Sequence, residues 1–318
     1  MFIKDKDEIM LDIISYNTEE YDYPCLLVLG CFDAIHVGHD KLLKEAKLQA
    51  KINGLDLGVM MFTEGKGDKQ IYSFEERVSL LEQYNVKFVF KIDFTEEFKK
   101  TKPLDFIKVV EDKLNVKAYM SGKDFRFGEK ASGKSSTLKK YAEDEENGVW
   151  YTAVKDVLYG EEKISTTRIK ELIENGRVKK VAKMLGRPFS VTGEVVKGEG
   201  RGKSLGYPTL NINYPEYKVQ LKHGVYGVEC SLDGQTYKGV ANYGNKPTYG
   251  NENIQLEVYL DSFSGDLYGQ TVTVEFLRYI RDIHKFDSDD ELKAQLAQDV
   301  VNVSTEVSDD EGCAEDND

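Results

Sequence analysis

The sequence predicts two consecutive folds: an α/β domain with a doubly wound parallel sheet, then an antiparallel β-barrel or sandwich closed by a C-terminal helix. In the first half, short apolar, β-rich runs alternate with segments of helical periodicity, a pattern typical of βαβ units. From about Arg187 onward, glycine and tyrosine become frequent and helical periodicity disappears until the end. A chain of 318 residues can form two domains, each with its own core.

The elements of the first half follow from apolar spacing and helix-start signals. Phe74, Val78 and Leu81 recur at helical spacing. Pro103 stands at the favoured first turn of another helix, whose apolar stripe extends to Leu114. We therefore expect helices over 39–52 and 74–84 and from Pro103 onward, and strands at 26–32, 57–62, 86–92, 118–121 and 149–154.

The second half is dominated by strand signals. Asp233-Gly234 between two β-rich runs is a hairpin turn signal, and Leu292, Leu296 and Val300 indicate one amphipathic helix over 288–303. Two short helices over 169–185 bridge the halves. We expect strands at 191–196, 225–232, 237–242, 255–260 and 270–277, and domains at 1–185 and 186–305, with an acidic, solvated tail at 306–318.

Charge and cysteine content narrow the function classes. The net charge is −13, and seven acidic residues with no Lys or Arg lie between Glu306 and Asp318. A broad nucleic-acid footprint needs a basic face, which this balance disfavours. No run approaches the roughly 18 apolar residues of a membrane span, and no signal-peptide pattern opens the chain. The four cysteines show no CxxC pair, so we expect free thiols in a cytoplasmic protein, without nucleic-acid or membrane partners.

The segment Gly30–His39 is the most informative motif. It follows the apolar run 26–29 and leads into a predicted helix, so a strand turns on glycine and delivers two histidines to a helix start. The free N–H groups and positive dipole of a helix N-terminus bind phosphate, and imidazoles there can neutralise charge during phosphate transfer. The motif alone is also consistent with ordinary helix capping. The candidate ATP-binding residues are Gly30, Phe32, Asp33, His36, Gly38 and His39, with His36 and His39 as candidate catalytic residues.

A second polar block lies far downstream at another predicted helix start. Ser165, Thr166 and Thr167 supply hydroxyl groups, and Arg168 supplies a guanidinium that can bind phosphate oxygens through paired hydrogen bonds. The alternative interpretation is a simple N-cap, for which Ser and Thr are favoured. We predict that these four residues contact ATP phosphates.

A glycine-dense basic loop precedes Tyr207 in the second half. Glycine allows the backbone to approach a phosphate closely, although a flexible turn is an equally good interpretation of the loop alone. The predicted phosphate-binding residues of this loop are Gly198, Gly200, Gly202, Lys203 and Gly206.

Taken in order, these blocks resemble known families. Gly30–His39 and the block at 164–169 together resemble the nucleotidylyltransferase superfamily, and the segment Gly122–Gly128 is similar to the DFRFG signature of prokaryotic FAD synthetases. The run Gly206–Asn211 resembles the G-x-P-T-x-N motif of riboflavin kinases. This resemblance implies that Pro208, Thr209 and Asn211 bind ATP together with the glycine-dense loop. Residues 20–303 therefore resemble the bifunctional riboflavin kinase/FMN adenylyltransferases. The resemblance implies a nucleotidylyltransferase domain followed by a kinase β-barrel.

The resemblance also implies activities and residue roles. ATP would phosphorylate riboflavin to FMN in the second domain, and a second ATP would adenylylate FMN to FAD in the first, releasing pyrophosphate. Glu257 would act as the base on the ribityl 5′-hydroxyl, and Thr209 and Asn211 would hold Mg²⁺, whose preferred ligands are oxygens. Arg281 would contact flavin or phosphate. Asp124, Phe125 and Arg126 would bind FMN; the expected partners are riboflavin, FMN and ATP, with FAD as product and no oligomer predicted.

Three alternatives remain open at this point. Cys31 and Ala34 stand where the family usually has Asn and Gly, and the segment 64–68 lacks the usual proline-containing turn. These departures are consistent with a riboflavin kinase whose first domain is a catalytically silent nucleotide- or flavin-binding module. A non-catalytic flavin sensor would bind in both halves. Adenylylation of another phosphate acceptor is the third alternative, because the fold does not fix the acceptor.

Overall fold

The computed structural model describes residues 11–16, 19–64, 67, 69–198, 206–245 and 254–304, which form two compact units. The first unit consists of Met1–Lys170, Met184–Gly186 and Tyr217–Val219. The second consists of Glu171–Lys183, Arg187–Glu216 and Gln220–Asp318. The three-residue segment Tyr217–Val219 therefore belongs to the first unit, although it lies between two strands of the second in the sequence.

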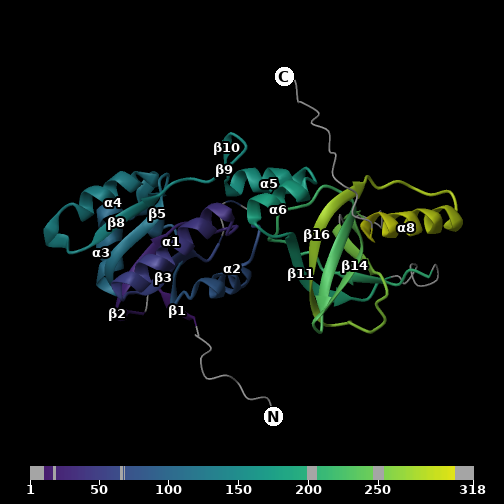
Figure 1. Ribbon diagram of the computed structural model, residues 1–318, viewed down its shortest axis with the longest axis horizontal. Helices are drawn as coiled ribbons and strands as arrows, with labels where there is room; N and C mark the ends of the chain where they lie inside the picture. Colours follow the sequence, from purple (N-terminus) through teal and green to yellow (C-terminus); the bar gives the residue numbers. More distant parts are fainter. Residues whose placement is uncertain are drawn as a thin grey trace, which may run out of the picture. The chain divides into compact units, whose positions relative to one another are not determined.

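The first unit is built on a six-stranded parallel sheet with the strand order β1-β4-β3-β2-β5-β8 (Figure 1). Helices connect successive central strands, as in βαβ units. Its elements are β1 (Asp12–Ser15), β2 (Tyr21–Leu29), α1 (Val37–Asn53), β3 (Asp56–Phe62), α2 (Phe74–Leu81), β4 (Phe88–Ile92), α3 (Pro103–Lys113), β5 (Leu114–Gly122), β6 (Arg126–Phe127), β7 (Gly133–Lys134), α4 (Ser135–Ala142), β8 (Trp150–Val154), β9 (Leu158–Tyr159) and β10 (Glu162–Lys163).

Apolar cores cover both faces of this sheet. Along β2, Leu26 and Val28 pack with residues of α1 and α2, whereas Leu27 and Leu29 pack with residues of α3 and α4. A strand that is buried on both faces reads as a continuous apolar run, which is why 25–29 contains no polar residue. This arrangement confirms the predicted doubly wound α/β fold.

The sequence located most strands but placed some ends differently from the structure. β2 already begins at Tyr21 and ends at Leu29, and β1 was not expected. Leu114, predicted as the last apolar position of a helix, is the first residue of β5; its N–H still bonds the carbonyl oxygen of Val110. A residue at a helix-to-strand junction is buried in either conformation, so apolar spacing does not distinguish them.

The second unit is a closed antiparallel barrel with the strand order β11-β12-β15-β14-β13-β16. Val300 and Val303 of its C-terminal helix pack on Val225 and Val240 of the barrel. The structure thus confirms a barrel followed by a helix. Its strands and C-terminal helix are β11 (Phe189–Val196), β12 (Thr209–Ile212), β13 (Gly224–Leu232), β14 (Gln235–Asn245), β15 (Ile254–Leu260), β16 (Thr271–Arg281) and α8 (Asp289–Ser304).

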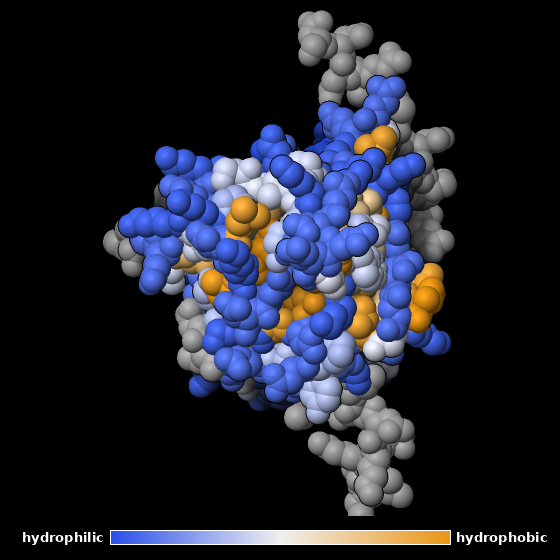
Figure 2. Space-filling model, turned by 90° about the vertical axis from the view of Figure 1, so that its left-hand side faces the viewer, coloured by the Kyte–Doolittle hydropathy of each residue, from blue (hydrophilic) through white to orange (hydrophobic). Residues whose placement is uncertain are grey.

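Two short helices join the halves of the sequence, as predicted: α5 (Thr166–Glu174) and α6 (Val178–Leu185). The face of the molecule shown in Figure 2 is mostly hydrophilic, with separate apolar patches. Isolated exposed apolar side chains of this kind are normal on globular proteins. Within the described residues, no helix is long and apolar enough to cross a membrane.

Candidate active sites

The first candidate site lies where the strand order of the parallel sheet reverses. From β2 the chain adds β3 and β4 on one side of the sheet and then β5 and β8 on the other. Leu29 at the end of β2 is paired with Ser121 near the end of β5, so the loops that follow these strands begin side by side. Ligands of open α/β sheets bind in the crevice outside the carboxyl ends at such a switch point. The loop beginning at Gly30 and the segment Gly122–Phe127 therefore border the expected crevice.

His36 caps the N-terminus of α1 through its ring. Its Nδ1 accepts hydrogen bonds from the backbone N–H groups of Gly38 (3.1 Å) and His39 (3.3 Å). The His36 and His39 rings stack with their centroids 3.8 Å apart, and Phe32 packs against His39. Because Nδ1 of His36 accepts, the network assigns the proton of the neutral ring to Nε2. The capping interpretation is therefore correct for His36, and the cap fixes its ring at the N-terminus of α1. Helix N-termini in general favour anions.

Glycines in this loop are required by close packing. A Cβ at Gly30 would lie 2.7 Å from the Phe32 ring, and one at Gly38 would lie 2.9 Å from Cε1 of His36. Phe32 and Ile35 have positive φ values of 47° and 44°, which are uncommon for bulky residues and indicate local strain. The loop is thus a tight turn that brings the imidazole rings to the helix start.

Asp33 is fully buried at the centre of this loop and pairs with a lysine of α5. The Nζ of Lys170 lies 2.8 Å from its Oδ2 and also donates to the carbonyl oxygen of Lys69. Lys170 therefore joins three segments: the loop after β2, the segment after β3, and the helix that begins at Thr166. Sequence reasoning missed Lys170, because a lysine two positions after Arg168 carries no signal of a buried partner.

The residues of the predicted phosphate-binding block at 165–168 have different contacts in the structure. Ser165 Oγ accepts from the N–H of Arg168 (3.3 Å), as an ordinary cap does. The guanidinium of Arg168 pairs with Glu162 (2.8 Å) and lies over the ring of Tyr159. Thr166 is half-buried and Thr167 is exposed. The structure thus brings this helix to the Asp33 loop through Lys170, while Arg168 contacts the β9–β10 hairpin.

The segment after β5 is held by an ion-pair cluster. Lys163 bridges Asp124 (2.5 Å) and Asp156 (2.8 Å); burial lowers its pKa, but the two carboxylates outweigh this effect and raise it. Phe125 stacks on Phe127 with 5.6 Å between ring centroids. Arg126 is exposed on the short strand β6. The three predicted FMN-binding residues therefore lie together at the end of β5, next to the end of β2.

Arg77 is a second residue that the sequence did not reveal. Its side chain is fully buried and donates to the carbonyl oxygens of Phe62 (3.0 Å), Thr63 (2.8 Å) and Ser73 (3.1 Å). Burial lowers the pKa of its guanidinium, and Asp33 is the largest of the charges that oppose this shift. Arg77 therefore holds both ends of the segment that joins β3 to α2.

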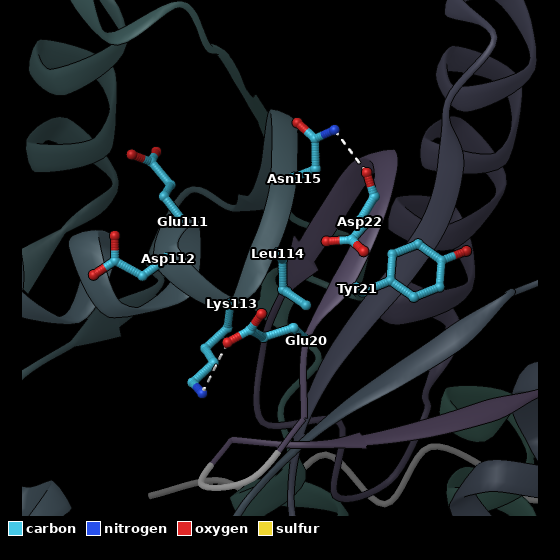
Figure 3. Close-up of a pocket in the computed structure, with 8 residues that line it drawn as sticks. All are labelled: Glu20, Tyr21, Asp22, Glu111, Asp112, Lys113, Leu114 and Asn115. Carbon is cyan, nitrogen blue, oxygen red and sulfur yellow. Dashed lines mark hydrogen bonds and ion pairs between the residues drawn. The ribbon is translucent and has the colours of Figure 1, made fainter.

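A polar pocket in this unit lies at the other end of the strands, where β2 and β5 begin (Figure 3). It surrounds the starts of β2 and β5, where Asn115 donates to the carbonyl oxygen of Asp22 (2.8 Å) and Lys113 pairs with Glu20 (3.7 Å). Because the capped helix and the Asp33 loop lie at the other ends of these strands, this pocket is separate from the candidate site.

The second candidate site lies on strands of the barrel. Asn211 of β12 is directly opposite Glu257 of β15, and Thr209 is opposite Tyr259. Because side chains alternate along a strand, Thr209, Asn211 and Glu257 share one face of the barrel wall. The neighbouring Leu256 and Val258 point the other way and are buried. The register thus brings together three residues that lie up to 48 positions apart.

Asn211 is suited to bind a ligand through its side-chain carbonyl. Its Oδ1 is buried without a hydrogen-bond partner among the described residues, and a buried unpaired carbonyl is costly. A Cβ at Gly198 would lie 2.0 Å from its Nδ2, so the glycine-rich loop begins in contact with this side chain. Gly206 has a φ of +87°, which favours glycine, and leads through Pro208 into β12. Gly200, Gly202 and Lys203 lie outside the described residues.

Arg281 is fixed at the end of β16. Its guanidinium forms a paired interaction with the fully buried Asp299 of α8 (Nη2–Oδ2 2.8 Å; Nε–Oδ1 3.2 Å), and Gln295 also donates to Asp299. Nη1 of Arg281 lies 3.2 Å from Nδ1 of His284. In this structure Arg281 therefore anchors α8 to the barrel.

Comparisons with known proteins identify a family for each half of the chain. A family model described as FAD synthetase matches residues 18–168, and one described as riboflavin kinase matches 185–307. A bifunctional riboflavin kinase/FMN adenylyltransferase of Bacillus subtilis is 32% identical over 86% of this chain and 90% of that protein. The chain belongs to the bifunctional riboflavin kinase/FMN adenylyltransferase family.

Two further relatives extend this result. The Escherichia coli K12 protein of the same description is also 32% identical, over 86% of this chain and 90% of its own. A crystal structure from Streptococcus pneumoniae, described as a macrolide-efflux protein, is 31% identical, has a TM-score of 0.85, and covers 93% of this chain and 99% of its own. The similarity therefore spans both units.

Proposed function

We propose that this chain carries out two successive reactions at separate sites. It is a riboflavin kinase, which makes FMN from riboflavin and ATP, and an FMN adenylyltransferase, which makes FAD from FMN and a second ATP. Its substrates are therefore the small molecules riboflavin, FMN and ATP. We assign adenylyl transfer to a domain at 1–185 and phosphorylation to one at 186–305. The observation that supports the proposal is that one chain matches both family models, the FAD synthetase model over residues 18–168 and the riboflavin kinase model over 185–307.

In adenylyl transfer, a phosphate oxygen of FMN attacks the α-phosphorus of ATP and pyrophosphate leaves, so no enzyme nucleophile is required. The residues act by position and charge. We assign ATP phosphates to the N-terminus of α1, where Nε2–H of His36 and the ring of His39 would donate to oxygens that gain charge. Asp33 orients the loop through Lys170. The end of β5, with Asp124, Phe125 and Arg126, would receive FMN.

In phosphorylation, the riboflavin 5′-hydroxyl oxygen attacks the γ-phosphorus of ATP and ADP leaves. Glu257 would take the hydroxyl proton as general base. The Oδ1 of Asn211, which has no hydrogen-bond partner in the described part of the chain, and the hydroxyl of Thr209 fit a hard oxygen-liganded cation. Bound Mg²⁺ would neutralise charge on the ATP phosphates. Gly198 allows the loop backbone to lie against Asn211, close to these phosphates.

A time course tests the whole proposal. The purified chain is incubated with riboflavin, ATP and Mg²⁺, and the flavins are separated chromatographically. FMN that rises and then gives way to FAD is the expected result. FMN without FAD would instead indicate a kinase with a silent first domain, and no product would contradict both activities. Omission of Mg²⁺ should abolish both steps.

A further inference from the structure

The segment Tyr217–Val219 is inserted into the first unit, although it lies between β12 and β13 in the sequence. Gln70 donates its N–H to the carbonyl oxygen of Tyr217 (2.7 Å), and Val219 donates its N–H to that of Gln70 (2.8 Å). Lys218 thereby forms a parallel bridge with Gln70. This backbone pairing fixes the segment that follows β3.

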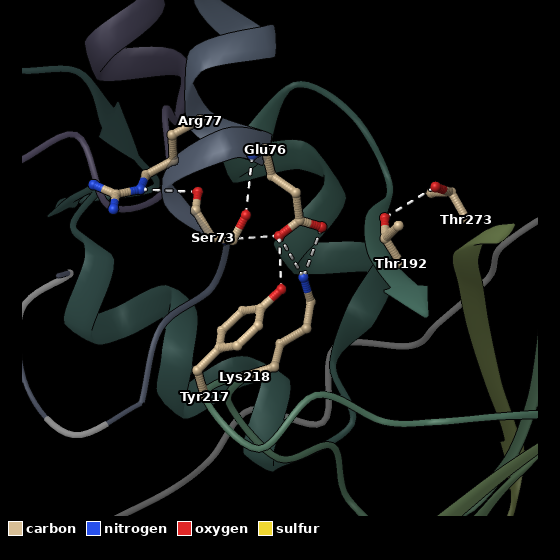
Figure 4. Close-up of polar contacts among 7 residues, drawn as sticks. All are labelled: Ser73, Glu76, Arg77, Thr192, Tyr217, Lys218 and Thr273. Atoms are coloured by element: carbon tan, nitrogen blue, oxygen red, sulfur yellow. Dashed lines mark hydrogen bonds and ion pairs between the residues drawn. The ribbon is translucent and has the colours of Figure 1, made fainter. Parts of the chain in front are cut away.

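The side chain of Lys218 is fully buried on this segment (Figure 4). Its Nζ lies 3.1 Å from both carboxylate oxygens of Glu76 and 5.0 Å from the centroid of the Tyr72 ring. Burial lowers the pKa of Lys218, and Glu76 opposes that shift. Glu76 also accepts from the N–H of Ser73 (2.7 Å) in the capping box of α2. A buried charge of this kind persists only with its partner in place.

These contacts connect Lys218 to the adenylyl-transfer site in three steps. The Lys218 side chain holds Glu76, and the backbone of its neighbours Tyr217 and Val219 pairs with Gln70. Next to Gln70, the carbonyl oxygen of Lys69 accepts from Lys170, and Lys170 forms the ion pair with buried Asp33. Asp33 lies in the turn that sets His36 at the start of α1. All of these residues belong to the first unit.

We propose that Lys218 is a positioning residue for adenylyl transfer. Through its buried ion pair with Glu76, beside the backbone pairing at Gln70, it holds the segment 69–73, and so the Lys170–Asp33 pair, in the geometry the reaction needs. The inference rests on the proposed function. It assigns to the first active site a residue that lies within the range matched by the riboflavin kinase model, 185–307. Because rates of positioned reactions fall steeply with small displacements, loss of Lys218 should reduce the rate constant more than the affinity.

The test uses the full-length chain with Lys218→Met, Lys218→Arg and the double variant Glu76→Gln/Lys218→Met. With FMN and ATP as substrates, Lys218→Met should lower kcat for FAD formation by roughly tenfold or more and change KM for ATP by less than about threefold. FMN formation from riboflavin should stay within about twofold of wild type, because the kinase site is not part of this network. Lys139→Met breaks an exposed pair with Glu143 in the same unit and should leave both steps unchanged.

The double variant separates positioning from folding. It leaves no buried charge unpaired, so it should recover thermal stability relative to Lys218→Met without recovering kcat for FAD formation, whereas Lys218→Arg should keep most of the rate. Wild-type kcat in a folded Lys218→Met variant would refute the proposal, as would a double variant in which stability and kcat return together. If the wild-type chain forms no FAD, the adenylyltransferase assignment itself fails, which is a distinct result.

Discussion

The two units build their sites by different means. In the first, the candidate residues lie on loops at the carboxyl ends of parallel strands, and buried ion pairs such as Asp33–Lys170 hold those loops. In the second, Asn211 and Glu257 lie on paired strands, so the hydrogen-bonded register alone fixes their spacing. A site on strands needs few supporting residues beyond its own sheet. A site on loops depends on distant charged partners, and it should therefore be sensitive to substitutions that touch no substrate.

The largest expected effect distinguishes the two sites directly. Glu257→Gln keeps the shape of the side chain but removes the base, so FMN formation should fall by about 10²–10⁴-fold. FAD formation from supplied FMN should remain at the wild-type rate, because that reaction uses the other unit. Initial rates of both steps check this. Equal losses in a folded variant would show that the two activities share one site.

The converse substitution acts on the loop site. The double change His36→Ala/His39→Ala removes the helix cap and both rings, and FAD formation should fall by roughly 10²-fold or more. Kinase activity should persist, and FMN should then accumulate from riboflavin and ATP. Continued FAD synthesis at the normal rate would exclude these histidines from the mechanism.

The dependence of the loop site on ion pairs can be measured as stability. Lys170→Met leaves the carboxylate of Asp33 buried without its partner, which should cost roughly 3–5 kcal/mol in the first unit. The chain has one tryptophan, Trp150 in β8, so its fluorescence during urea unfolding reports on this unit. Asp33→Asn combined with Lys170→Met should regain much of the loss. An unchanged unfolding midpoint for Lys170→Met would contradict the view that the loop depends on this pair.

The smallest effect concerns the barrel. Burial, followed by the facing Glu229, raises the pKa of Glu275 above its ordinary value of 4.5. The folded state therefore holds this proton more tightly than the unfolded state, and the resulting stability is lost as pH rises through the raised pKa. Glu275→Gln should stabilise the barrel at pH 7 by about 0.5 kcal/mol, since the pair is partly exposed and screened, and by less near pH 4.

Thermal unfolding of the variant at both pH values tests this result. Glu194→Gln is a matched control, because Glu194 of β11 faces Thr271 rather than a carboxylate. If Glu275→Gln stabilised the barrel as much at pH 4 as at pH 7, repulsion between Glu229 and Glu275 would not be the cause of the stabilisation.

The features that depend on local sequence patterns were predicted correctly. Apolar runs and helical spacing gave the order of strands and helices, and the two fold classes were confirmed. The motif at Gly30–His39 indicated a helix start bearing imidazoles, which the structure contains. Local patterns carry no information about Lys170 or Lys218. Each is paired with a carboxylate far along the chain, and its sequence neighbours do not distinguish it from a lysine on the surface. The strand at Thr209 was also missed, since Pro208 before it is typical of a turn.

Closure of the barrel has a consequence for behaviour at high concentration. Each of the six described barrel strands is hydrogen-bonded on both sides, so these strands offer no free edge on which another chain could add a strand. The parallel sheet of the first unit does have two edges, but they are formed by the short strands β1, of four residues, and β8, of five. A short edge strand offers few backbone groups to which a strand of another molecule could hydrogen-bond. Strand topology thus limits edge-to-edge pairing through the barrel and through the six-stranded sheet.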